Sequence, residues 1–171
     1  MRPISFYLCM CLACATPPAT VETTSATVGA LQRYRTFSFE HASAPPAGYH
    51  GSARGPEVVD IAESLVADDL ALKGFTHVPE DGDLIVVVSA GRRVVDKTRP
   101  LSRTAVVISG DRTETIRVPE GTIRVDAYDR TTRHEVWRGA ATDEVDFDAS
   151  KLDRARAVRT IDSIIARFPR R

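Results

Sequence analysis

Apolar residues recur along this chain at two different spacings, which predict two helices and several strands. A helix is expected over residues 55–73, where apolar positions repeat every three or four residues between an initial proline and a closing Lys-Gly pair. A second helix is expected from a cap at Asp148 or Ser150 to Phe168, because Pro169 ends the pattern. The apolar stripe of the first helix consists of Val58, Ile61, Ala62, Leu65, Val66 and Leu72, with Asp69 as its polar exception.

Strands are predicted where apolar residues alternate with polar ones or form a β-branched run. The run at 83–88 is typical of a central strand buried on both faces. Residues 122–128 alternate almost perfectly, and their expected partner is 135–147 across a turn at 129–132. Further strands are expected at 34–39, 105–108 and 113–118, with a break at Pro119-Glu120-Gly121.

Two amphipathic helices that bracket strands joined by short turns predict an α+β fold. We expect a two-layer sandwich, with a mostly antiparallel sheet of about five strands and both helices on one face. Residues 40–55 contain two prolines and three glycines, so they are expected to form a long loop.

The first fifteen residues have the pattern of an export signal: an arginine, a short apolar run and small residues at the end. The run is too short to span a bilayer. Leu12-Ala13-Cys14 resembles the lipobox of bacterial lipoproteins, in which the thiol of Cys14 carries a diacylglycerol, although Cys11 stands where that pattern usually has leucine. Cleavage after Ala15 would instead leave a soluble secreted or periplasmic protein.

The predicted organisation is a lipoprotein signal peptide at 1–14, a flexible tether rich in small residues at 15–30, and a single α+β domain at 31–171. All three cysteines lie in the signal peptide, so the domain must be held together by its apolar core. Ala15 follows the cysteine where an aspartate would signal retention, so by resemblance to the Gram-negative sorting rule we expect an outer-membrane anchor facing the periplasm.

Charge excludes one class of partner. Basic and acidic residues balance at 23 each, and no aromatic residues interleave the C-terminal arginines. The chain therefore has neither the positive electrostatic potential nor the aromatic side chains for base stacking that nucleic-acid binding requires.

Several phrases, in a fixed order, resemble the bacterial lipoprotein family known as domain of unknown function 4136. That resemblance implies an exported, mostly lipid-anchored protein and supplies no activity or catalytic residue. The matching phrases are Tyr34-Arg35-Thr36-Phe37, Leu72-Lys73-Gly74-Phe75, Asp83-Leu84, Gly121-Thr122-Ile123-Arg124-Val125, Val136-Trp137-Arg138-Gly139 and Phe168-Pro169.

Four residues are candidates for binding. His41, Tyr49 and His50 lie in the long loop, and Trp137 is the single tryptophan. Their spacing matches no zinc signature, so solvated loop side chains are the favoured interpretation, and changing Tyr49 and His50 should barely affect stability. A strand aromatic packed under a helix is favoured for Trp137, because Gly139 and Ala140 leave room for it.

Other chemistry is weakly indicated. The acidic group Asp143, Glu144, Asp146 and Asp148 lacks the glycine and the terminal glutamate of an EF-hand, so calcium is a minor alternative. No serine-hydrolase elbow is present in the sequence. We expect no cofactor, no metal and no enzymatic activity.

The expected protein is an anchored, non-catalytic binding or structural module with an unidentified envelope protein partner. A small-ligand or peptide carrier that uses the 41–55 loop is the alternative, and a hydrolase ranks below both.

Overall fold

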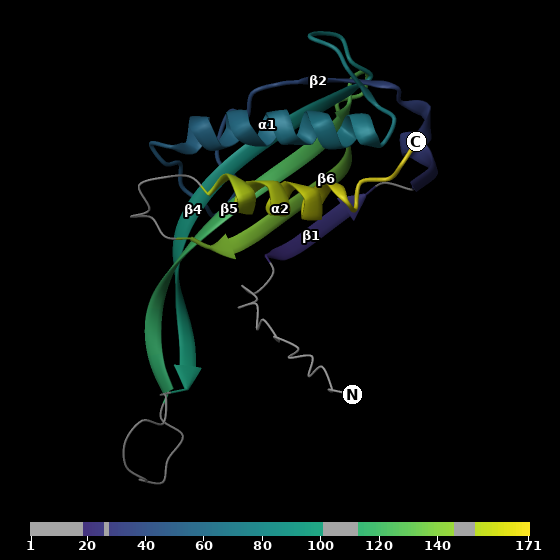
Figure 1. The fold of residues 1–171 in the computed structure, drawn as a ribbon. Helices are drawn as coiled ribbons and strands as arrows, with labels where there is room; N and C mark the ends of the chain where they lie inside the picture. Colours follow the sequence, from purple (N-terminus) through teal and green to yellow (C-terminus); the bar gives the residue numbers. More distant parts are fainter. Residues whose placement is uncertain (1–18, 26–27, 101–112, 146–152) are drawn as a thin grey trace, which may run out of the picture.

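The computed structural model describes residues 19–25, 28–100, 113–145 and 153–171 (Figure 1). Their strands form one six-stranded sheet in the order β1-β6-β5-β4-β2-β3, and both helices cover the same face of it. The expected α+β class is confirmed, with one strand more than expected. The elements are β1 (Thr20–Ser25), a 3-10 helix (Val28–Arg33), β2 (Thr36–Phe39), α1 (Gly55–Leu72), β3 (Thr76–His77), β4 (Leu84–Pro100), β5 (Thr113–Asp129), β6 (Glu135–Glu144) and α2 (Arg154–Ile165).

Pairing in the sheet is antiparallel along β1, β6, β5 and β4, whereas β2 is parallel to both β3 and β4. The expected partnership between residues 122–128 and the following strand is confirmed by the β5–β6 register, which pairs Ile123 with Ala141 and Ala127 with Trp137. The expected strand at 105–108 lies outside the described residues.

The predicted break in β5 is wrong. A single strand runs through Pro119 and Gly121 from Thr113 to Asp129 and pairs with β4 along its whole length. Pro119 lies just outside the β5–β6 pairing, because β6 pairs with β5 only from Glu120 onward. At such an edge position a proline removes no ladder hydrogen bond that the sheet needs.

The predicted tether is wrong from Thr20 onward. Thr20–Ser25 forms the edge strand β1, which pairs with β6 from Thr20↔Thr142 to Ser25↔Trp137, and a 3-10 helix follows. The threonines and Val21 suit an edge strand, and this β-propensity outweighs the low complexity of the segment. Residues 15–18 lie outside the described part.

The core lies between the helices and the sheet. Trp137 is 1% exposed and meets the ring of Phe168, with the centroids 4.8 Å apart. On α1 the buried residues are Ala62, Val66 and Leu70, each four positions from the next. The expectation that Leu72 faces the core is wrong, because this last helical residue is 82% exposed. It lies two positions from Leu70 and so on the other side of the helix.

The predicted cap of α2 is also displaced. Asp153 is the N-cap, and its Oδ1 accepts a hydrogen bond from the amide of Arg156 at 3.0 Å. Asp148 and Ser150, the expected caps, lie outside the described residues.

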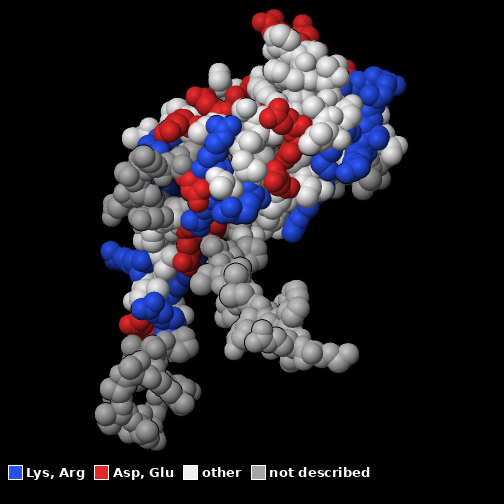
Figure 2. Space-filling model, in the orientation of Figure 1, with Lys and Arg blue, Asp and Glu red and all other residues white. Residues whose placement is uncertain are grey.

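The sheet face away from the helices buries a charge. Asp126 of β5 is fully buried there between two guanidinium groups, with Arg138 Nε at 2.7 Å and Arg124 Nε at 2.8 Å. Two cations compensate the desolvation of the carboxylate. On the helix side, Figure 2 shows carboxylates along α1 and basic side chains gathered towards one end of the molecule.

Candidate functional site

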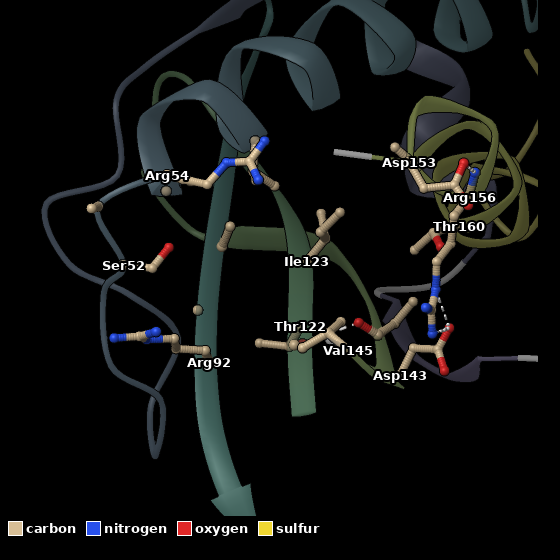
Figure 3. Close-up of a pocket in the computed structure, with 18 residues that line it drawn as sticks. Ser52, Arg54, Arg92, Thr122, Ile123, Asp143, Val145, Asp153, Arg156 and Thr160 are labelled. Carbon is tan, nitrogen blue, oxygen red and sulfur yellow. Dashed lines mark hydrogen bonds and ion pairs between the residues drawn. The ribbon is translucent and has the colours of Figure 1, made fainter. Parts of the chain in front are cut away.

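A cavity of about 480 Å³ lies on the helix face of the sheet, where the inward side chains become small. Along β4 the residues on that face run Leu84, Val86, Val88 and then Ala90, because alternate strand residues share a face. Ala90 pairs with Ile123 of β5, and Gly121, two residues from Ile123 on the same face, adds no side chain at all. Ile123 forms the middle of the floor (Figure 3).

The walls of the cavity are the beginnings of the two helices. Ser52 and the first turn of α1 line one side, and Asp153 and Thr160 of α2 line the other (Figure 3). The first helix has Arg54 at its N-cap position and no side-chain hydrogen bond there. Positive ends of both helix dipoles therefore border the cavity.

Three arginines (Arg54, Arg92 and Arg156) and two aspartates (Asp143 and Asp153) bring charge to an otherwise mostly apolar lining. Arg54 reaches from the start of α1 toward α2 in Figure 3, and its Nε also lies 3.2 Å from Glu57 Oε2. Arg156 crosses the opposite wall to Asp143, with its Nη2 2.7 Å from Oδ2. The ion pair of Arg156 joins α2 to β6 at the wall of the cavity.

The volume lies in the range of small-molecule sites, which combine an apolar surface with a few polar groups. The lining residues include no histidine, cysteine, lysine or glutamate among the described part of the chain. The cavity can therefore enclose an apolar body and place a polar or anionic group near Arg54.

The four predicted binding residues do not come together. Trp137 points into the core on the helix face, as its favoured interpretation holds, so it is not an exposed anchor. His41 and His50 have exposed side chains. His50 contributes its backbone, which pairs with Arg92 through hydrogen bonds of 2.8 and 2.9 Å.

Tyr49 is not the solvated loop residue that the sequence suggests. Its ring is half-buried, its hydroxyl lies 3.3 Å from Thr142 Oγ1, and the guanidinium of Arg93 stacks 4.5 Å from the ring centroid. A Cβ on Gly91 would come within 2.6 Å of Tyr49 Cβ, so the glycine admits the loop onto the sheet. Tyr49 is thus a packing residue.

Of the 41–55 loop, only its end lines the cavity, through residues 52–55. The sequence alone did not indicate Ala90, Gly121 or Ala141 as floor residues. The available signal was a set of very small residues at inward strand positions, which predicts a hollow only once the register places them side by side.

The acidic group offers no cation site within the described residues. Asp143 pairs with Arg156, and Glu144 lies 2.8 Å from Lys97 Nζ. No cluster of three metal-ligating side chains occurs in the described ranges. Asp146, Asp148 and the predicted lipidation residue Cys14 lie outside them.

A second, polar hollow lies at the opposite end of the sheet around Asp129. Its carboxylate accepts hydrogen bonds from the Tyr34 hydroxyl at 2.7 Å and the Thr132 amide at 2.7 Å, and Arg33 Nη2 lies 3.0 Å away. The hydrogen bond from Tyr34, with those from Thr132, holds the pKa of Asp129 well below its usual range. These interactions join the β5–β6 turn to the 3-10 helix and the residue that follows it.

Comparison with known proteins gives a family and a fold. The sequence profile of Domain of unknown function (DUF4136) matches residues 21–170. No curated protein matches the chain. Among the described residues, neither helix has the length and apolar character needed to cross a bilayer.

Three solved structures are similar. A PDZ domain protein from Parabacteroides distasonis is 13% identical with a TM-score of 0.57, over 88% of this chain and 35% of that one. The chain therefore spans about a third of that protein, and the likeness concerns the fold alone. A PelC dodecamer from Paraburkholderia phytofirmans has 14% identity and a TM-score of 0.48 over 86% and 95% of the two chains. A minor lipoprotein from Acinetobacter baumannii has 14% identity and a TM-score of 0.40, over 81% and 99%.

Proposed function

The chain belongs to the family of domain of unknown function 4136, and from this premise we propose that it is an exported, lipid-anchored envelope lipoprotein that works as a non-catalytic binding module. The observation that carries the binding role is the mostly apolar cavity between the helix ends and the sheet. The signal peptide and Cys14 support the anchor, and Ala15 supports the outer membrane facing the periplasm.

The anchor is tested on the full chain by cell fractionation. In Cys14→Ala the protein should leave the membrane fraction or keep an uncut signal, because the acyl acceptor is gone. Cys9 lies outside the lipobox, so Cys9→Ala is the matched control and should fractionate like the wild type. An unmodified N-terminus on a wild-type protein that still sediments with membranes would refute lipidation.

The second candidate, a carrier of small ligands, is favoured by the position of residues 52–55, which bring the end of the predicted loop to the wall of the cavity. A suitable ligand has an apolar body that covers Ile123 and Ala141 and a polar or anionic group that reaches Arg54. Arg156 is paired with Asp143, so the anionic group of a ligand would lie nearest Arg54 or Arg92, the other two arginines of the lining.

Filling the cavity tests this binding role. Ala157 of α2 lines the cavity, so Ala157→Leu should lower the affinity for an anionic apolar probe such as anilinonaphthalene sulfonate at least tenfold. Ala155 lies on the exposed side of the same helix, and Ala155→Leu is the control. Equal probe affinity in both variants would show that the cavity is not the binding site.

A further inference from the structure

The two longest strands extend beyond the rest of the sheet as a ribbon. Val94–Pro100 of β4 pairs with Thr113–Pro119 of β5 in seven consecutive residue pairs. No third strand joins them among the described residues, since β6 pairs with β5 only from Glu120 onward. At about 3.3 Å per residue this ribbon, here called the arm, is roughly 20 Å long. Figure 1 shows it projecting past the end of the sheet.

The arm has little of its own to stabilise it. A two-stranded ribbon is marginally stable in water, and apart from the hydrogen bond that Val145 N donates to Pro119 O at the base of the arm, no described strand pairs with either edge. Val94 is 58% exposed, and Ile116 is only half-buried. The ion pairs along it, such as Arg99 with Glu114, are exposed and therefore contribute little. A surface that covers the arm would stabilise it.

The register places the base of the arm beside the start of β1. Thr20 pairs with Thr142, Thr142 with Thr122, and Thr122 with Gly91, so all four lie at one level across the sheet. The arm begins three residues beyond Gly91. Cys14 precedes Thr20 by six residues, which span at most about 20 Å. An acyl group on Cys14 therefore holds the start of β1 within about 20 Å of the bilayer, which is the length of the arm.

We infer that the arm is a second membrane contact, which lies against the phospholipid headgroups of the leaflet that holds the lipid on Cys14. This inference rests on the proposed lipid anchor. The arm is assigned to the membrane because the lipid on Cys14 keeps the bilayer close to the arm. No other surface is tethered to this end of the domain.

The chemistry of the arm suits a headgroup layer. Basic Lys97, Arg99 and Arg117 alternate with acidic Asp96 and Glu114, which matches the phosphates and ammonium groups of phospholipids (Figure 2). Guanidinium groups bind phosphate through two parallel hydrogen bonds. The side chain of Arg117 is 84% exposed, and its ion pair with Asp96 is long, at 3.8 Å between Nε and Oδ1. The guanidinium group is therefore able to turn to a phosphate.

The test uses the acylated full chain in vesicles of phosphatidylethanolamine and phosphatidylglycerol that contain a spin-labelled headgroup quencher. The domain has no cysteine of its own, so Thr98→Cys places a single thiol for a fluorophore on the arm. Leu72→Cys is the control, because Leu72 is exposed and α1 ends next to β3, which lies by the Leu84 end of β4, opposite to the arm. We expect at least a twofold loss of fluorescence at position 98 and little change at position 72.

Each outcome is decisive. An acylated protein whose label at position 98 is quenched no more than that at position 72 overturns the arm contact and leaves the proposed function standing. Protection of position 98 together with cross-linking between arms overturns it in favour of a second copy of this chain. Absence of an acyl group refutes the proposed anchor, and the arm contact falls with it.

Discussion

The ring of Trp137 lies directly over Gly139, two residues further along β6. A Cβ on Gly139 would come within 2.3 Å of Trp137 Cη2 and within 2.7 Å of Ile164 Cγ2. The glycine therefore opens the slot in which the indole packs between β6 and α2, and the two residues form one packing unit.

Gly139→Ala should lower the free energy of unfolding by about 1–3 kcal/mol, because the new methyl group displaces a buried indole. Trp137 is the single tryptophan, so its fluorescence reports both the unfolding transition and any shift of the ring. Gly51→Ala is the control, since its nearest neighbour there would be Pro45 Cγ at an ordinary 3.7 Å. Unchanged stability in Gly139→Ala would contradict this packing.

Tyr49→Ala should cost about 1–2 kcal/mol, since it removes a half-buried ring stacked under Arg93. His50→Ala should change stability by less than about 0.5 kcal/mol, because His50 pairs through its backbone alone. Chemical denaturation of the two single variants measures the difference. If both are neutral, Tyr49 is the solvated residue that the sequence suggested.

Acid should remove the contribution of Asp129. Because the folded-state pKa of Asp129 lies below the unfolded value of about 4, its stabilisation is present above that value and declines as pH falls through it. Asp129→Asn should be less stable than the wild type at pH 7, and the difference should shrink by pH 3. Denaturation at the two pH values measures this, with the exposed Asp96→Asn as control. A difference that stays constant would contradict the linkage.

Replacing Asp69 by asparagine should have the opposite effect on stability. Burial raises the pKa of Asp69, and the facing carboxylate of Asp162 raises it further, so the ionised form destabilises the helix seam at neutral pH. Asp69→Asn should raise the melting temperature at pH 7, and the gain should shrink as the pH falls from the raised folded pKa towards the unfolded value of about 4, below which it should be absent. Asp68→Asn, on the exposed side of α1, should show no such gain. A lower melting temperature in Asp69→Asn at pH 7 would mean that its attraction to Lys73 outweighs the repulsion.

The sequence by itself determined the α+β class, the first helix, the β5–β6 pairing and the burial of Trp137. Each follows from a local pattern: the stripe of α1, the alternation at 122–128 and the small Gly139 beside a large ring. Local patterns suffice there because the residues that decide the structure are close together in the chain.

Only the tertiary structure decided the rest. Thr20–Ser25 is a strand because β6 offers it an edge. β5 continues through Pro119 because the pairing with β6 ends at Glu120, whereas the pairing with β4 continues. Asp126 is buried on the outer face because two arginines cover it. Ala90 and Ala141 form a cavity floor because the register aligns both with Ile123, and Gly121 lies two residues from Ile123 along β5. The pairing of Thr20–Ser25 and the cavity floor join segments that are distant in sequence, and Asp126 meets Arg138 only because the β5–β6 register places them opposite each other. A local pattern carries no information about such a neighbour.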